Sequence, residues 1–253
     1  MTKRILVTND DGVRSEGILA LAEALKPLGD VIIVAPLNEA SAIGHALTLR
    51  RPLHIEPFGA GIYAVDGTPT DCVNIAVTKV LDRMPDLIVS GINKGWNIGD
   101  DVTYSGTVSG ALEGALLGVP SIAVSLKYTR EAFDFGPAST AAALYAKAVL
   151  DKGLPPRTLI NINVPTGPIR GYRVTVQGKR NHVTSVMDVI DPRQRVWYWI
   201  EEGQNDWEPH DRSDYQAVKD GFVSVTPLHP DLTNYDALRA VETLPIETEV
   251  EVK

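Results

Sequence analysis

Short apolar runs alternate with amphipathic segments through the first two thirds of the chain. The continuous apolar runs predict buried strands at 5–8, 31–35, 86–90, 121–125 and 159–164. Between them, apolar residues recur at helical spacing, which predicts helices at 16–26, 70–80, 108–117 and 138–150. Because strands and helices alternate strictly, the pattern favours an α/β fold whose mostly parallel sheet is covered by helices on both faces.

Shorter apolar segments lie between the second buried strand and the helix at 70–80. They predict strands at 47–49 and 54–57, which we expect to form a hairpin, and a further strand at 63–65. Thr68 or Thr70 is expected to cap the helix that follows.

The pattern changes after residue 165. Alternating or apolar segments predict strands at 172–176, 196–200 and 222–225 and a helix at 232–241, whereas 179–195 offers few core positions. We therefore expect a core at 1–165 and a β-rich region at 166–253 that completes a single domain. Trp197 and Trp199 indicate an interface between subunits, or alternatively a cover for the sheet.

Composition narrows the class of protein. The chain has 253 residues, 44% of them hydrophobic and 22% charged, and no apolar run long enough for a membrane span. Its start shows no signal-peptide pattern, and the single cysteine, Cys72, excludes an internal disulfide, so we expect a cytoplasmic protein with no membrane partner. The net charge of −8 argues against binding to nucleic-acid polymers.

Two adjacent carboxylates, Asp10 and Asp11, directly follow the first strand. In open α/β sheets, ligands bind at the carboxyl ends of the strands. Two acidic groups held this close repel each other unless a cation lies near them, which favours a hard divalent ion such as Mg²⁺ or Mn²⁺. The alternative is an ordinary surface turn, because Asn, Asp and Gly are common turn residues.

Three loops should converge at this edge of the sheet, at 9–12, 37–45 and 91–107. They contain the oxygen donors of a Mg²⁺-like site: two carboxylates, a serine hydroxyl and an asparagine amide. Ser105, Gly106 and Thr107 open a helix whose backbone N–H groups suit a phosphate. Each loop also has a structural interpretation as a tight turn or a helix cap, but their convergence favours a metal-assisted phosphoryl site.

Other signatures of phosphate and acyl chemistry are missing. The chain has no P-loop sequence, no dinucleotide-binding glycine pattern after its first strand and no nucleophile elbow. His45 lies in one of the converging loops, where it would assist proton transfer or have a structural role.

Seven ordered motifs span nearly the whole chain and resemble those of the survival protein SurE family. They are VTNDDG at 7–12, AP at 35–36 followed by Ser41 and by GH at 44–45, GTPTDCV at 67–73, SGIN at 90–93, YSGT at 104–107, LININVP at 159–165 and GFVSVTPL at 221–228.

The resemblance implies a metal-dependent phosphatase of nucleoside 5′- and 3′-monophosphates, and in some members of short polyphosphate. It implies one divalent metal ion per subunit, Mg²⁺ or Mn²⁺, with Asp10 and Asp11 catalytic. The implied metal ligands are Asp10, Asp11, Ser41 and Asn93, and the implied phosphate pocket comprises Asn9, Asn97, Ser105, Gly106 and Thr107.

The resemblance also implies a three-layer, Rossmann-like core. To this it adds a C-terminal β-rich extension with protruding arms and a final helix, exchanged between subunits in a homodimer or homotetramer. Trp96 stands where many members have proline, so that it would stack on a base or merely cover the loop.

Two questions stay open at this level. The attacking group would be a metal-activated water or one of the two aspartates. The competing class of function is a non-catalytic nucleotide-binding regulatory module on the same fold, since a fold does not determine a function.

Overall fold

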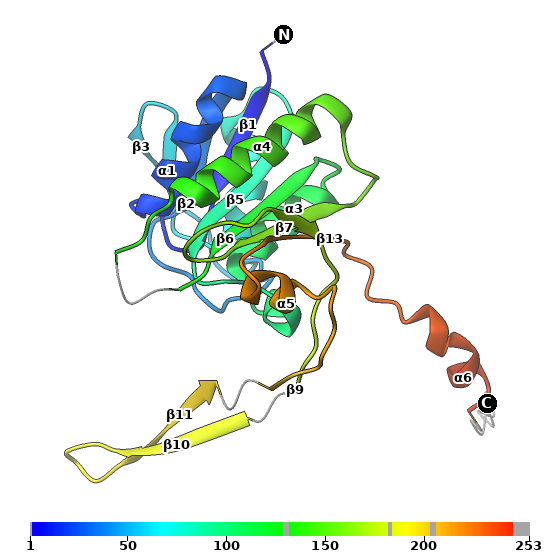
Figure 1. Ribbon diagram of the computed structural model, residues 1–253. Coiled ribbons are helices and arrows are strands. Elements are labelled where there is room, and N and C mark those ends of the chain that lie inside the picture. Colours follow the sequence, from blue (N-terminus) through cyan, green and yellow to red (C-terminus); the bar gives the residue numbers. More distant parts are fainter. Residues whose placement is uncertain (1, 129–131, 182–183, 203–205, 245–253) are drawn as a thin grey trace, which may run out of the picture.

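A nine-stranded sheet between two layers of helices forms the centre of the molecule (Figure 1). The computed structural model describes residues 2–128, 132–181, 184–202 and 206–244, so the parts of the expected C-terminal region at 182–183, 203–205 and 245–253 lie outside the described residues. The strands of this sheet are β1 (Arg4–Thr8), β2 (Asp30–Pro36), β3 (Ile55–Gly59), β4 (Ile62–Val65), β5 (Leu87–Lys94), β6 (Ser121–Leu126), β7 (Leu159–Val164), β8 (Tyr172–Val174) and β13 (Val223–Leu228).

The strand order is β3–β4–β2–β1–β5–β6–β7–β13–β8. The pairs β3–β4 and β7–β13 are antiparallel, whereas the other neighbours in this sheet are parallel. The predicted α/β fold with a mostly parallel sheet is thus confirmed.

The two faces of the sheet carry different helices. On one face α1 (Glu16–Leu25) and α4 (Gly136–Lys152) pack against side chains that include Ile5 and Val7 of β1. On the other face α2 (Pro69–Ile75) packs against Leu6, and α3 (Gly106–Leu116) lies beside α2. Successive side chains of a strand point to opposite faces, so an unbroken apolar strand requires cover on both sides.

Local sequence fixes where the helices begin. Ser15 caps α1, and Thr68, rather than Thr70, caps α2 in a reciprocal capping box with Asp71. The helix expected at 70–80 continues from α2 into a single π-helical stretch, Ala76–Val80. A short 3₁₀ helix, Lys26–Leu28, follows α1.

Parallel pairing brings the loops after β1, β2 and β5 to one edge of the sheet. Thr8 at the end of β1 lies opposite Ser90 of β5, and β5 continues to Lys94. Within the loop expected at 91–107, residues 91–94 belong to β5, and a 3₁₀ helix, η3 (Gly99–Thr103), comes before α3.

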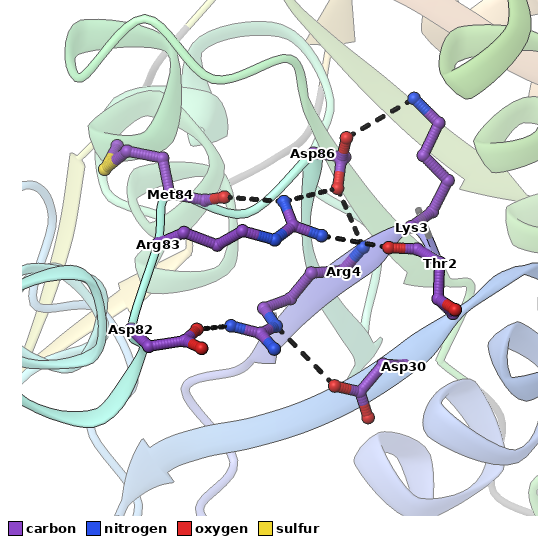
Figure 2. A network of polar contacts seen from close by, with 8 residues as sticks. All are labelled: Thr2, Lys3, Arg4, Asp30, Asp82, Arg83, Met84 and Asp86. Carbon is purple, nitrogen blue, oxygen red and sulfur yellow. Dashed lines mark hydrogen bonds and ion pairs between the residues drawn. The ribbon is translucent and has the colours of Figure 1, made fainter.

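A charged network lies at the amino ends of the central strands, opposite the ends where the loops converge (Figure 2). Asp86 accepts hydrogen bonds from the Arg4 backbone at 2.8 Å, from Arg83 at 3.0 Å and from Lys3 at 3.3 Å, which together lower its pKa to about 2. Arg4 also pairs with Asp82. Because these residues lie at the amino ends of β1 and β5, the network joins strands and is remote from the edge where the loops converge.

The C-terminal region both completes the sheet and leaves it. Strands β8 and β13 join the central sheet, and α5 (Asp214–Lys219) packs on β13. A hairpin of β10 (Thr184–Ile190) and β11 (Val196–Glu202) projects from the body, as does the chain that carries η4 (Tyr235–Ala237) and α6 (Leu238–Glu242) (Figure 1). At the root of the hairpin, β9 (Arg180–Asn181) pairs with β12 (Asp206–Trp207).

The strand predicted at 47–49 is wrong. This segment has no strand partner, and Leu47 and Leu49 are exposed. Thr48 instead donates its backbone N–H and its hydroxyl to the Asp71 carboxylate, at 2.9 and 2.7 Å. The hairpin is instead formed by β3 and β4, the outermost strands on one side of the sheet, in which Ile55 pairs with Val65.

No helix in the described ranges is long and apolar enough to cross a membrane.

Candidate functional site

The Asp10 carboxylate lies at the end of β1 against the first turn of α3. Its side chain is almost fully buried, and the Thr107 hydroxyl donates a hydrogen bond to it. The Thr107 backbone hydrogen-bonds to the same carboxylate. A helix N-terminus has unpaired N–H groups and a partial positive charge, so α3 provides a favourable place for this anion.

Glycine at position 106 makes this contact possible. A Cβ atom on Gly106 would lie 2.8 Å from the Cβ and 2.9 Å from Oδ2 of Asp10, closer than carbon and oxygen atoms can pack. Beside it, the Ser105 hydroxyl oxygen accepts a hydrogen bond from the Val108 backbone at 3.0 Å and caps α3. The structure therefore brings Asp10, Ser105, Gly106 and Thr107 together, as the sequence predicted.

Both aspartate carboxylates have raised pKa values, and burial is the main cause. Desolvation raises the pKa of Asp10 even though Thr107 opposes the rise. For Asp11, desolvation and the neighbouring Asp10 charge raise the pKa to about 6, and the backbone and ammonium group of Lys94 oppose this only in part. A bound cation would relieve both effects, because it compensates the buried negative charge.

Two buried oxygen atoms at this place also lack a hydrogen-bond partner among the described residues. They are Oδ2 of Asp11 and Oδ1 of Asn9, whose amide nitrogen donates to the Gly12 carbonyl at 3.0 Å. Buried oxygens without a partner are rare and call for an explanation, such as an ion. Within the described ranges no three His, Cys, Asp or Glu side chains cluster as metal ligands. A cation here would therefore need neutral oxygens beside the two carboxylates, and Mg²⁺ and Mn²⁺ accept such a set.

Backbone hydrogen bonds hold the loop after β2 at Asp10 and at Tyr104. The Ala40 N–H donates to the Asp10 carbonyl at 2.8 Å, and the Gly44 N–H donates to the Tyr104 carbonyl at 3.0 Å. Ser41 follows Ala40 directly. Its side chain is exposed, and its hydroxyl donates to the Glu39 carboxylate at 2.8 Å instead of contacting Asp10 or Asp11.

Asn93 lies near the end of β5 and uses its amide nitrogen locally. This nitrogen donates to the Gly95 carbonyl at 2.9 Å. Lys94, the next residue, is close enough to Asp11 to influence its pKa. The residue after Asn93 therefore lies beside Asp11, while the Asn93 side chain itself bonds to Gly95.

Asn97 is held by a buried amide cluster that the sequence analysis did not identify. Its backbone N–H donates to Asn163 at 2.7 Å, and its carbonyl accepts from Asn161 at 2.8 Å and from Asn163 at 3.0 Å. Its own amide nitrogen donates to Ser125 at 2.8 Å. Asn161 and Asn163 are fully buried on β7, and two asparagines two residues apart in an otherwise apolar strand were the available signal.

His45 is tied to α3 and does not approach the aspartates through any hydrogen bond in the described structure. Its Nε2 lies 2.7 Å from Oε2 of Glu113, and Asn74 of α2 donates to Oε1 of the same carboxylate at 2.7 Å. The hydrogen bond with His45 is the main reason that the pKa of Glu113 is lowered. Of the two roles considered for His45, the contacts favour the structural one.

Trp96 packs against the C-terminal region. Its ring makes an edge contact with Tyr215 of α5 at 6.1 Å between centroids, and the Lys127 ammonium lies 4.9 Å from its centroid. These contacts match the covering role expected as one of its two alternatives.

Comparison with known proteins gives a consistent result. A family model described as "Survival protein SurE" matches residues 5–184. A protein named 5'-nucleotidase SurE from Geobacter metallireducens is 51% identical over 243 residues, which are 95% of this chain and 96% of that protein. One with the same name from Syntrophotalea carbinolica is 52% identical over 91% of this chain and 93% of its own.

Comparison with solved structures points to the same family. The crystal structure of SurE protein from Aquifex aeolicus superposes with a TM-score of 0.84 at 45% identity, covering 94% of this chain and 98% of that one.

Proposed function

The chain belongs to the survival protein SurE family, and from this membership we propose that it is a 5'-nucleotidase, a phosphatase that hydrolyses nucleoside monophosphates to nucleoside and phosphate. We extend the proposal to metal dependence, to 3′-monophosphates and to short polyphosphate. The observation that carries it is the adjacent carboxylate pair of Asp10, buried against the start of α3, and Asp11, half-buried, with the unpartnered oxygens Oδ2 of Asp11 and Oδ1 of Asn9 beside them.

The proposed metal ligands are Asp10, Asp11, Ser41 and Asn93. The amide nitrogen of Asn93 is used by Gly95, which leaves its amide oxygen for a cation. Ser41 reaches the site only if its hydroxyl leaves Glu39, and it belongs to a loop already held at Asp10. A divalent ion bound here would polarise the phosphoryl group and favour the attack of a nucleophile.

The side chains and backbone of the protein position the charged groups. Thr107 fixes the orientation of the Asp10 carboxylate, and Gly106 lets this carboxylate approach the helix. The N–H of Gly106, at the first position of α3, has no acceptor within the helix and suits a phosphate oxygen. We place Asn9, Asn97, Ser105, Gly106 and Thr107 around the phosphate, with Asn97 held in place by the amide cluster on β7.

The alternative of a non-catalytic nucleotide-binding module has no support in the comparisons, in which the matched relatives carry the name of an enzyme.

Phosphate release should require a divalent cation. We expect the purified protein to liberate phosphate from AMP or GMP in the presence of Mg²⁺ or Mn²⁺. Release should stop when EDTA removes the ion, because the two adjacent carboxylates without a cation repel the substrate phosphate. A colorimetric phosphate assay over nucleotides, deoxynucleotides and polyphosphate measures this. Restored activity after excess metal is added back controls for damage by EDTA. A folded protein with no metal-dependent release from any of these substrates would contradict the proposal and favour the binding module.

We also propose that residues 166–253 form the assembly region of a homodimer or homotetramer that exchanges its C-terminal arms. Exposed apolar side chains cover both faces of the projecting hairpin, among them Met187, Trp197, Trp199 and Ile200. Apolar surface of this kind marks interfaces. Cys72 is buried and free, which agrees with the reducing cytoplasm that we propose as the place of action.

Replacing both Trp197 and Trp199 with serine should weaken the assembly. The two indoles are 55% and 66% exposed, so their removal costs the isolated chain little packing but takes two aromatic anchors from an interface. Multi-angle light scattering should show the mass falling towards that of one chain. Leu49→Ser, which removes an 83% exposed side chain outside the hairpin, is the matched control. A double variant with the mass of the unmodified assembly would exclude the hairpin as an interface.

A further inference from the structure

The C-terminal region, from the segment that leads into the hairpin to α5, holds the loop between Asn97 and Ser105. At the centre of this contact is Asp214, the first residue of α5, whose side chain is fully buried. Its Oδ2 accepts a hydrogen bond from the Gly99 N–H at 2.9 Å. Its Oδ1 accepts from the N–H groups of Gly178 at 2.9 Å and of Tyr215 at 2.8 Å. One carboxylate therefore joins the loop of the site to the C-terminal region.

Further contacts reach the same loop from the same side. The Gln177 amide donates to the Gly99 carbonyl at 2.9 Å. Arg180 of β9 pairs with Asp101 at 3.2 Å, and its backbone N–H donates to Asp100 at 3.3 Å. Both carbonyl and N–H of Gly99 are thus bonded to the segment that leads into the hairpin or to α5.

The packing around position 99 leaves no room for any residue larger than glycine. A Cβ atom on Gly99 would lie 2.5 Å from the Trp207 ring, and its φ of +53° is in the left-handed region. Trp207 is itself stacked on Tyr215, with 4.5 Å between centroids and 6° between planes. Gly99 consequently packs against an aromatic pair that belongs to the C-terminal region.

We propose that Asp214 is a positioning residue for the phosphatase reaction, and that it sets the place of the loop that carries Asn97 and Ser105 into the phosphate pocket. This inference rests on the proposed function. Asp214 does not touch the reacting atoms in this scheme. It acts through the Gly99 backbone, two residues from Asn97 and six from Ser105. Its loss would displace groups that hold the phosphoryl oxygens in the bound substrate and in the transition state alike, which weakens substrate binding.

A single isosteric change isolates the contact with the loop. In Asp214→Asn the remaining oxygen can serve Gly178 and Tyr215, while the amide nitrogen faces the Gly99 N–H, donor against donor. The change leaves the two bonds within the C-terminal region and removes the one to the loop. Asp220→Asn is the matched control, since Asp220 lies directly after α5 and bonds Gln216 and Arg173 instead of the loop.

The experiment compares steady-state kinetics of the full-length protein and both variants with AMP and with p-nitrophenyl phosphate. We expect Asp214→Asn to raise KM about tenfold for both substrates, because they share only the phosphoryl group, and Asp220→Asn to leave KM unchanged. A purely structural role would reduce the amount of active enzyme and lower the apparent kcat without moving KM. Hydrogen exchange should show faster exchange of the Gly99 amide in Asp214→Asn, whatever the activity.

Unchanged KM and unchanged exchange at Gly99 in an active Asp214→Asn variant would overturn the inference and leave the proposed function intact. If the unmodified protein releases phosphate from no substrate, the proposed function fails, and the positioning role fails with it. Should Asp214→Asn not fold, Gln177→Ala removes the bond to the Gly99 carbonyl from an exposed side chain. A smaller rise in KM for both substrates supports the inference in that case, and an unchanged KM overturns it.

Discussion

Asp10→Asn should largely abolish metal-dependent phosphate release and leave the protein folded. Asparagine has nearly the same shape, and its oxygen can still accept the hydrogen bond from Thr107. It removes the negative charge that we propose binds the ion. Metal ions contribute several kcal/mol of charge stabilisation to such reactions, and each 1.36 kcal/mol is a factor of ten, so turnover should fall about 100-fold or more.

The stability of this variant gives a second, opposite result. Burial raises the pKa of Asp10 above its usual value of 3.8. A carboxyl group whose pKa is raised in the folded state lowers the free energy of unfolding once the pH exceeds its unfolded pKa. At pH 7 the metal-free Asp10→Asn variant should therefore be at least as stable as the unmodified protein.

Thermal unfolding with and without Mn²⁺ separates the two effects. Added metal should raise the Tm of the unmodified protein, because a ligand that binds only the folded state stabilises it, and should hardly change that of the variant. Asp151→Asn, on the exposed face of α4 and paired only with Lys147 among the contacts described, is the control and should behave like the unmodified protein. Near-normal turnover in Asp10→Asn would refute the proposed metal site.

Gly106→Ala should have the second largest effect on activity. The added methyl group would lie 2.8 Å from Cβ of Asp10, which is buried and cannot move into solvent. Either the carboxylate or the first turn of α3 must shift, and a shift of about 1 Å costs about 100-fold in rate when catalytic groups are displaced. Steady-state kinetics with AMP under saturating Mn²⁺ measure the loss.

The control for this prediction is another glycine-to-alanine change. A Cβ atom on Gly59 of β3 would make only ordinary contacts with Ile62, at 3.5 Å or more, so that Gly59→Ala should keep full activity. Full activity in Gly106→Ala would show that the Asp10 side chain tolerates displacement, and would contradict its proposed close fit to the helix.

The buried elements of the fold were predictable because their apolar residues recur at regular spacing along the sequence. The strands that carry the site are unbroken apolar runs, and the helices between them show the spacing of one covered face. Elements without such spacing were missed or misplaced. Strand β10 lies in an exposed hairpin, so its alternating side chains mark no core, and α5 has only six residues. Leu47 and Leu49 carried an apolar signal, but neither is buried.

The site divides in the same manner. Asp10 and Asp11 follow β1 directly, and the turn at Ser105–Thr107 opens the helix after β5, so parallel pairing of β1 with β5 predicts that they meet. Asp214 could not be placed in this way, because its partner Gly99 lies 115 residues away and the contact depends on how the C-terminal region returns to the sheet. Long-range contacts between loops have no periodic signature in a single sequence.

The glycines of α3 fix how closely this helix packs on the sheet. A Cβ atom on Gly110 would lie 2.9 Å from Thr8, and one on Gly114 would lie 2.2 Å from Ser121. Glycine at these two positions therefore lets the helix lie close against the Thr8 and Ser121 side chains of the sheet, and this close packing helps to set how near its first turn comes to Asp10. The spacing between α3 and the sheet at the candidate site thus depends on the missing side chains of Gly110 and Gly114. A single methyl group at either position would alter the site without contacting any residue within it.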